Sequence, residues 1–145
     1  MRLIPRDPTF VPDLAAQRRA ARLLREIAPR ADDITTTVSD DVEFVDCGGN
    51  WEGVRCPHCH ATLDDWWSTA FDESAASRFT ELEFEVPCCG QRSALPALDF
   101  IWPVGFARFV LEARNARLAG KIPHRKLAKL ERVLGCSLRL VIAHY

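Results

Sequence analysis

Two stretches of the chain repeat apolar residues every three or four positions, which is the spacing of the buried face of a helix. The first opens after Pro12, ends at Pro29 and contains Ala16, Ala20, Leu23, Leu24 and Ile27. The second contains Leu63, Trp66, Trp67, Ala70 and Phe71. These stripes predict helices over residues 12–28 and 63–76, and the two tryptophans are favoured as core residues over a stacking surface for a ligand.

The C-terminal third predicts two more helices and a final strand. One helix follows the Trp102-Pro103 turn, and its apolar stripe is Phe106, Phe109, Val110 and Ala113. Gly120 and Pro123 separate the other helix from the first. We expect it to end at Gly135 in a left-handed cap, and its inward-facing residues are Leu127, Leu130 and Leu134. The alternation of Leu138, Leu140 and Ile142 predicts a strand paired inside a sheet.

Period-two alternation and β-branched residues indicate the remaining strands. Residues 34–38 and 42–45 predict a hairpin, and residues 92–100 predict a short strand broken at Pro96. Residues 79–86 alternate an apolar and an acidic side, namely Leu82, Phe84 and Val86 against Glu81, Glu83 and Glu85. The order of elements lacks the strand–helix alternation of parallel sheets, so we expect an α+β fold with a mostly antiparallel sheet, about four helices and a single domain over residues 1–145.

The composition excludes some classes of protein. No stretch approaches the roughly 18 apolar residues that a membrane-spanning helix needs. Residues 1–10 have no apolar run, so we expect neither a signal peptide nor a membrane association. Six cysteines in such a chain are typical of metal ligands and buried thiols in a reducing compartment, and we therefore expect a cytoplasmic protein.

Charges are segregated along the chain, although the net charge is only −1. Residues 31–100 carry fifteen acidic and three basic side chains, whereas the flanking segments together carry five acidic and sixteen basic ones. Two outcomes are open: the segments neutralise each other in the fold, which we favour, or they present faces of opposite sign to partners.

Two short cysteine stretches hold the candidate chemistry. In Cys56-Pro57-His58-Cys59-His60, two thiolates of one turn can point at one ion. Val86-Pro87-Cys88-Cys89-Gly90 aligns with that turn through its proline and glycine, so Val86 stands where the first cysteine would be and Cys89 is the aligned ligand. We therefore predict a closed structural site for Zn²⁺, held by Cys56, Cys59, Cys88 and Cys89.

Other ligand sets stay open. Adjacent residues of a regular strand face opposite ways, so Cys88 and Cys89 can share an ion only if the chain turns there, which the flanking proline and glycine favour. If it does not turn, Cys47 is the best substitute, and His58 and His60 are in reserve. We consider three interpretations less favourable: an iron–sulfur cluster, buried thiols without a metal, and a disulfide.

Catalytic motifs are missing from the sequence. It has no phosphate loop, Rossmann glycine triplet, G-x-S-x-G or H-E-x-x-H motif, and no histidine is followed two positions later by glutamate, as in zinc deaminases. We assign no catalytic residue and do not expect an enzyme. A zinc hydrolase using Asp64 or Asp65 is kept as an alternative.

The stretches CGGNWEGVRCPHC, PCCG, WPVGFARFVLEARN and LGCSLRLVIAHY resemble a group of small uncharacterised proteins from high-GC actinobacteria, over most of the chain. The resemblance implies paired cysteine hairpins like those of zinc ribbons. Members of the group often carry the label of a sugar transporter ATPase. We do not expect that activity, because the chain has no phosphate loop or Walker lysine.

These features together predict a zinc-stabilised binding module that acts through protein–protein contact, as an adaptor or an immunity-type protein. The residues expected to face a basic partner are Glu81, Glu83, Glu85, Asp40 and Asp41. A nucleic-acid-binding module is the alternative, although no aromatic residues interleave its basic run, which is Arg114, Arg117, Lys121, His124, Arg125, Lys126, Lys129 and Arg132.

Overall fold

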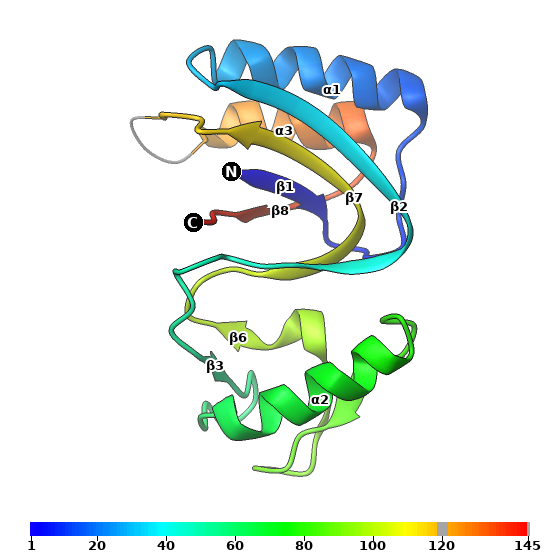
Figure 1. Cartoon of the computed structure of the whole chain (residues 1–145), viewed down its shortest axis with the longest axis vertical. Coiled ribbons are helices and arrows are strands. Elements are labelled where there is room, and N and C mark those ends of the chain that lie inside the picture. Colours follow the sequence, from blue (N-terminus) through cyan, green and yellow to red (C-terminus); the bar gives the residue numbers. More distant parts are fainter. Residues whose placement is uncertain (119–121, 145) are drawn as a thin grey trace.

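The computed structural model describes residues 1–118 and 122–144. Its elements are β1 (Arg2–Pro5), α1 (Leu14–Ile27), β2 (Asp33–Val45), β3 (Val54–Arg55), α2 (Asp64–Ala76), β4 (Glu83–Glu85), β5 (Arg92–Ala94), the 3-10 turn η1 (Leu95–Ala97), β6 (Asp99–Phe100), β7 (Gly105–Arg114), α3 (His124–Leu134) and β8 (Leu138–Val141). The predicted α+β class is confirmed (Figure 1), with three α-helices in the described residues instead of about four.

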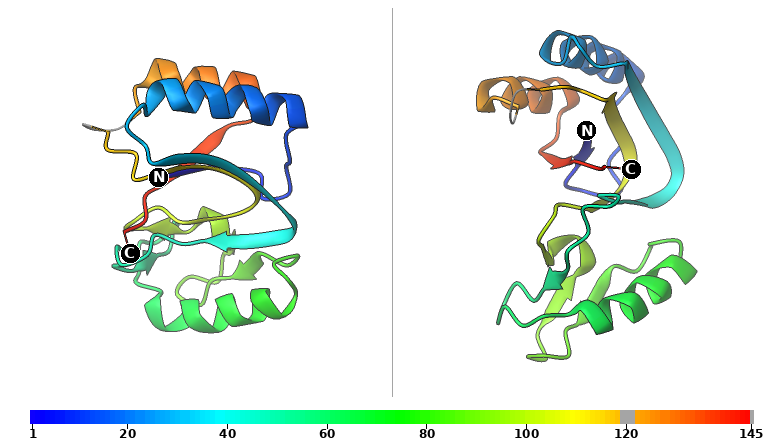
Figure 2. Two further views of the ribbon diagram at one scale, coloured as in Figure 1. Left: turned by 45° about the horizontal axis from the view of Figure 1, so that its top comes forward. Right: turned by 60° about the vertical axis from the view of Figure 1, so that its left-hand side comes forward.

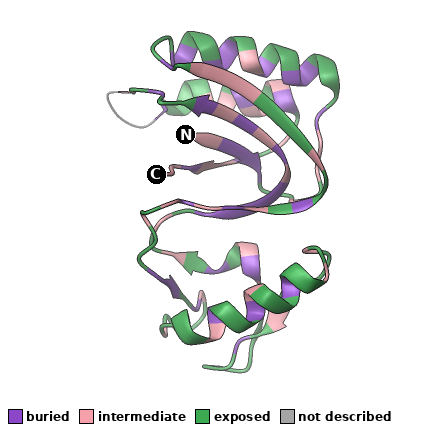
Figure 3. Cartoon of the chain, viewed as in Figure 1, coloured by how far each residue is buried: buried purple, intermediate pink, exposed green. Residues whose placement is uncertain are grey.

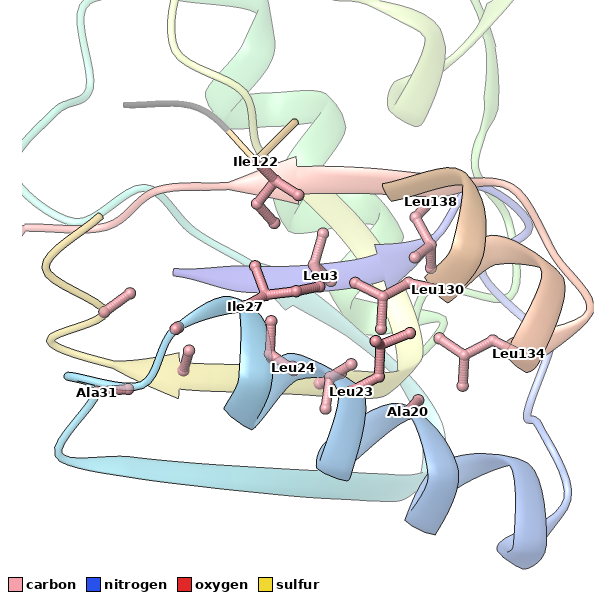
Figure 4. Packing of buried hydrophobic residues seen from close by; sticks show 14 of the residues in the cluster. Leu3, Ala20, Leu23, Leu24, Ile27, Ala31, Ile122, Leu130, Leu134 and Leu138 are labelled. Atoms are coloured by element: carbon pink, nitrogen blue, oxygen red, sulfur yellow. The ribbon is translucent and has the colours of Figure 1, made fainter. Parts of the chain in front are cut away.

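The larger part of the molecule is a four-stranded sheet with the order β2-β7-β1-β8, in which every neighbouring pair is antiparallel. Helices α1 and α3 lie side by side on one face of it (Figure 2). Beneath them, Leu24 and Leu130 from the helices pack with Leu3 of β1 (Figure 4). Leu111 of β7 belongs to the same cluster. Each such buried side chain stabilises the fold by about 1.5–3 kcal/mol.

The smaller part, which we call the cysteine lobe, comprises residues 46–104. It contains α2 and two two-stranded sheets, β3-β6 and β4-β5. Its core holds the buried Trp67 and Leu95, and it also receives Val42 from β2 and Phe106 from β7. The two longest strands therefore contribute to both cores and join the lobe to the main sheet (Figures 1 and 3).

The helix predicted after Trp102-Pro103 is wrong, because these residues form β7. The apolar residues of this stretch suit either period: Phe109, Leu111 and Ala113 are buried, and the residues between them are half-buried. These residues form a strand instead of a helix because β7 is hydrogen-bonded to β2 along one edge and to β1 along the other.

The hairpin predicted within residues 34–45 is also wrong. A single strand, β2, runs through the whole segment, and its partner is β7. The register shifts between Val38 and Glu43, so the residues with turn chemistry form an irregularity that bends the strand without reversing it.

Three further elements differ from expectation. The strand predicted over residues 79–86 is shortened to β4, because Arg78 and Phe79 take left-handed φ angles of 54° and 55°. Strand β8 lies at an edge of the main sheet instead of inside it. Strand β1, which has no sequence signal of its own, lies inside it. Gly120, predicted between two helices, is outside the described residues.

Candidate metal centre

Four thiols meet between the turn after β3 and the turn that joins β4 to β5. The Sγ atoms of Cys56, Cys59, Cys88 and Cys89 all lie within 4.8 Å of one another. The Cys56–Cys89 and Cys59–Cys88 sulfur pairs are 3.8 Å and 3.3 Å apart. In a tetrahedral site with zinc–sulfur bonds of about 2.3 Å, two sulfurs lie about 3.8 Å apart. The cluster thus has the dimensions of a four-thiolate metal site and could hold an ion.

The two turns have the same backbone geometry. The N–H of His60 donates to the carbonyl of Cys56 at 3.0 Å, and the N–H of Gly90 donates to that of Val86 at 2.8 Å. The N–H groups of Cys56 and Val86 each donate to the carbonyl five residues further on, at 2.9 Å and 2.8 Å. His60 and Gly90 both take a left-handed φ, 61° and 68°. Position by position, Val86 therefore corresponds to Cys56 and Cys88 to His58.

This correspondence explains the unusual cysteine pair. Val86 occupies a ligand position without a donor atom and is fully buried in the core of the lobe. Cys88, from the middle of the turn, supplies the fourth thiol instead, because the chain does turn there. Cys56 is buried while Cys59 and Cys88 are exposed, so the cluster borders solvent on one side.

The reserve ligands are not part of the cluster. Cys47 is buried and lines a separate hollow of about 280 Å³ beside Trp51 and Phe71, and burial raises the pKa of its thiol. The ring Nε2 of His58 lies 3.3 Å from a main-chain carbonyl. Neither these residues nor His60 belong to the four-residue group of potential ligands.

Main-chain N–H groups favour ionisation of one thiol of the cluster. Desolvation opposes ionisation of Cys56, but the N–H groups of Cys59 and His58 outweigh it and lower the pKa of Cys56 to about 6. The hydrogen bond with Cys59, followed by desolvation, raises the pKa of Cys88 to about 12. Without a metal, the Cys56 thiol therefore ionises more readily than the Cys88 thiol, and an ion bound by all four sulfurs would have to displace the proton of Cys88.

The two aspartates considered for a zinc hydrolase, Asp64 and Asp65, lie where they do not suit that role. Asp64 accepts a hydrogen bond from the N–H of Val54 at 2.8 Å, which ties the start of α2 to β3. Asp64 and Asp65 line a hollow of about 480 Å³ that Cys88 also borders. Because Cys88 belongs to the thiol cluster, a tetrahedral ion bound there would have no ligand position left for water.

Sequence reasoning missed one residue that holds the two parts of the molecule together. The guanidinium of Arg139 in β8 donates to the carbonyls of Val104 at 2.9 Å and Pro96 at 2.8 Å. Desolvation, with the nearby Arg6, lowers the pKa of this guanidinium. A charged residue between the apolar Leu138 and Leu140 was the available signal.

Comparison of the chain with family models, curated proteins and solved structures finds no match. The resemblance to small actinobacterial proteins stays a prediction. Among the described residues, no helix combines the length and the apolar character needed to cross a bilayer.

Proposed function

We propose that the chain is a zinc-stabilised binding module that acts through protein–protein contact in the cytoplasm. The observation that carries the proposal is the convergence of four thiols, all within 4.8 Å of one another, from two equivalent turns. Four thiolate ligands favour zinc, and such a closed site contributes folding free energy while leaving no position for a substrate. Free cysteines are compatible with a reducing compartment.

The distribution of charge supports a basic partner for the cysteine lobe. Residues 46–104 carry ten acidic and three basic side chains, whereas the rest of the chain carries ten acidic and sixteen basic ones. The cysteine lobe is thus net acidic and the rest of the chain net basic, although ion pairs such as Arg25–Asp33 and Arg117–Asp32 also join the acidic and basic segments. Regions of opposite charge steer association with partners of complementary charge.

The acid row, which we define as Glu81, Glu83 and Glu85, remains exposed, with Glu81 just before β4 and the other two within it. Glu83 has only a weak surface partner, Arg92 at 3.4 Å. Glu81 and Glu83 line an open groove of about 980 Å³, which is also lined by Arg6, just after β1, and Arg139 of β8. A groove of this size accommodates a segment of a partner chain. Asp41, expected on the same acidic surface, is instead 3.6 Å from Arg78.

Metal analysis tests the first half of the proposal. We expect one zinc per chain after cytosolic expression, lost in Cys59→Ser and retained in the matched control Cys136→Ser, whose thiol lies outside the cluster. Removal of the metal by a chelator should change the near-ultraviolet circular dichroism of Trp67, which packs in the core of the lobe. Bound iron would overturn the choice of zinc, and a folded chain without stoichiometric metal would overturn the site.

Affinity capture tests the second half. A protein partner should be retained by the wild type and lost by the triple variant Glu81→Gln, Glu83→Gln, Glu85→Gln. The control removes the same charge from the outer face of α2, as Asp65→Asn, Asp72→Asn and Glu73→Gln, all of which are exposed. Equal loss with both variants, or no captured partner with the wild type, contradicts recognition by the acid row.

A further inference from the structure

The outer faces of α1 and α3 carry two matching rows of cations. Their buried stripes, which include Leu24 in α1 and Leu130 in α3, point at the sheet. On the opposite side each helix has cations at positions i, i+4 and i+7, all of them exposed: Arg18, Arg22 and Arg25 in α1, and Arg125, Lys129 and Arg132 in α3. We call these six residues the basic face.

Both rows point to the same side of the molecule. Helices α1 and α3 lie next to each other on one face of the sheet (Figure 2), and each turns its apolar stripe towards it. Their outer sides therefore look away from the sheet together (Figure 3). Neighbouring packed helices are about 8–10 Å apart, so the two rows run along a common surface.

Few of the positive charges of the basic face have an acidic side chain beside them. Arg25 lies 3.8 Å from Asp33, and no other ion pair in the described part of the chain includes a residue of the face. The acidic residue of α3, Glu131, is half-buried, and its carboxylate turns to the start of β8, where it accepts a hydrogen bond from the N–H of Leu138 at 2.8 Å. Glu26, exposed at the flank of α1, is the one acidic residue beside the rows on that helix.

We propose that the basic face binds the phosphate backbone of double-stranded nucleic acid. At a rise of about 1.5 Å per residue, each row is about 10.5 Å long. One strand of a duplex carries a charge about every 3.4 Å along the axis, so a row matches about three phosphates. Two rows can follow the two strands at either side of a groove. Five of the six cations are arginines, whose planar forks suit phosphate oxygens.

The composition of the face distinguishes a duplex from a single strand. Single strands are held by aromatic side chains on which unpaired bases stack. Neither α1 nor α3 contains a phenylalanine, tyrosine or tryptophan. The contacts available are therefore with the backbone, and they read no sequence. The basic face shares its α3 row with the basic run of residues 114–132 and adds the row of α1. Of the rest of that run, Arg117 pairs with Asp32 at 3.2 Å and Lys121 is outside the described residues.

Fluorescence anisotropy with a labelled 20-base-pair DNA duplex of arbitrary sequence tests the proposal on the full chain. Six phosphate contacts predict a slope of roughly −5 in a plot of log K against log salt, or about 1,000-fold weaker binding at 200 mM than at 50 mM salt. The variant Arg22→Gln, Arg125→Gln, Arg132→Gln should make the slope shallower by about 3. The matched control removes three exposed arginines elsewhere, as Arg6→Gln, Arg55→Gln and Arg114→Gln, and should keep most of the slope.

Four results would overturn the proposal. The first is no binding of the duplex at 50 mM salt, and the second is binding that does not change with salt. The third is an equal loss of DNA binding in the control variant, which would show that binding depends on the net charge of the chain and not on the basic face. The fourth is binding of a single strand of the same length as tightly as the duplex. Salt-dependent self-association without DNA binding would instead identify the cysteine lobe of a second copy as the occupant.

Discussion

Moving the fourth thiol within its turn tests the equivalence of the two cysteine turns. Cys88→Ser removes one of the four thiols of the cluster. Adding Val86→Cys then places a thiol at the position that corresponds to Cys56, where both the hydrogen bonds and the complete burial of the two residues match. The double variant should therefore regain a four-thiolate site with conventional spacing.

The expected magnitudes follow from the ligand count. Structural zinc sites contribute about 10–16 kcal/mol at neutral pH, so one thiolate of four accounts for about 3 kcal/mol. Cys88→Ser should thus weaken zinc binding by about 100-fold or more. Val86 is fully buried, and its replacement by a residue of similar volume costs about 1 kcal/mol. The double variant should bind zinc within about tenfold of the wild type.

Competition with a chromophoric zinc chelator measures these affinities, and urea unfolding of the zinc-loaded proteins provides the corresponding free energies. Val86→Cys alone is the control for the packing change. If Cys88→Ser binds zinc as tightly as the wild type, Cys88 is not a ligand. If Val86→Cys does not rescue Cys88→Ser, the two turns are not equivalent as metal-binding units.

Three further changes probe the fold and the thiols. In the metal-free chain the folded-state pKa of Cys56 is lowered from 9.0 to about 6, so the unfolding free energy in urea should fall as pH drops from about 9 towards 6, and Cys56→Ser should abolish that dependence. Arg139→Lys should destabilise the chain by about 2 kcal/mol in the same assay, because one ammonium cannot replace a guanidinium that bonds two carbonyls, whereas the exposed Arg114→Lys should change little. Gly48→Ala should cost about 1–3 kcal/mol, since φ is 58° there and an added Cβ would meet the carbonyl of His144; Gly135→Ala, also at positive φ but with open space, should cost less.

Local patterns in the sequence were sufficient for elements whose determinants lie close together along the chain. The helices at residues 12–28 and 63–76 were predicted within two residues of α1 and α2, because one apolar stripe defines each of them. The left-handed end of α3 at Gly135, where φ is 76°, depends only on glycine having no side chain. The two cysteine turns are likewise local units, since Pro57 and Pro87 follow their first residues and His60 and Gly90 end them with a left-handed φ, whereas the meeting of the two turns depends on the fold of the lobe.

Only the tertiary structure decided the main sheet and the surfaces built on it. Strand β1 has four residues and no period of its own, and it forms because β7 and β8 pair with it from more than a hundred residues away in the chain. The apolar pattern of residues 105–114 suits a helix and a strand equally. These residues form a strand because β1 and β2 pair with them. The basic face likewise depends on α1 and α3, a hundred residues apart in the sequence, packing on one face of that sheet. Strand pairing and helix packing are long-range interactions, and a local pattern carries no information about its partner.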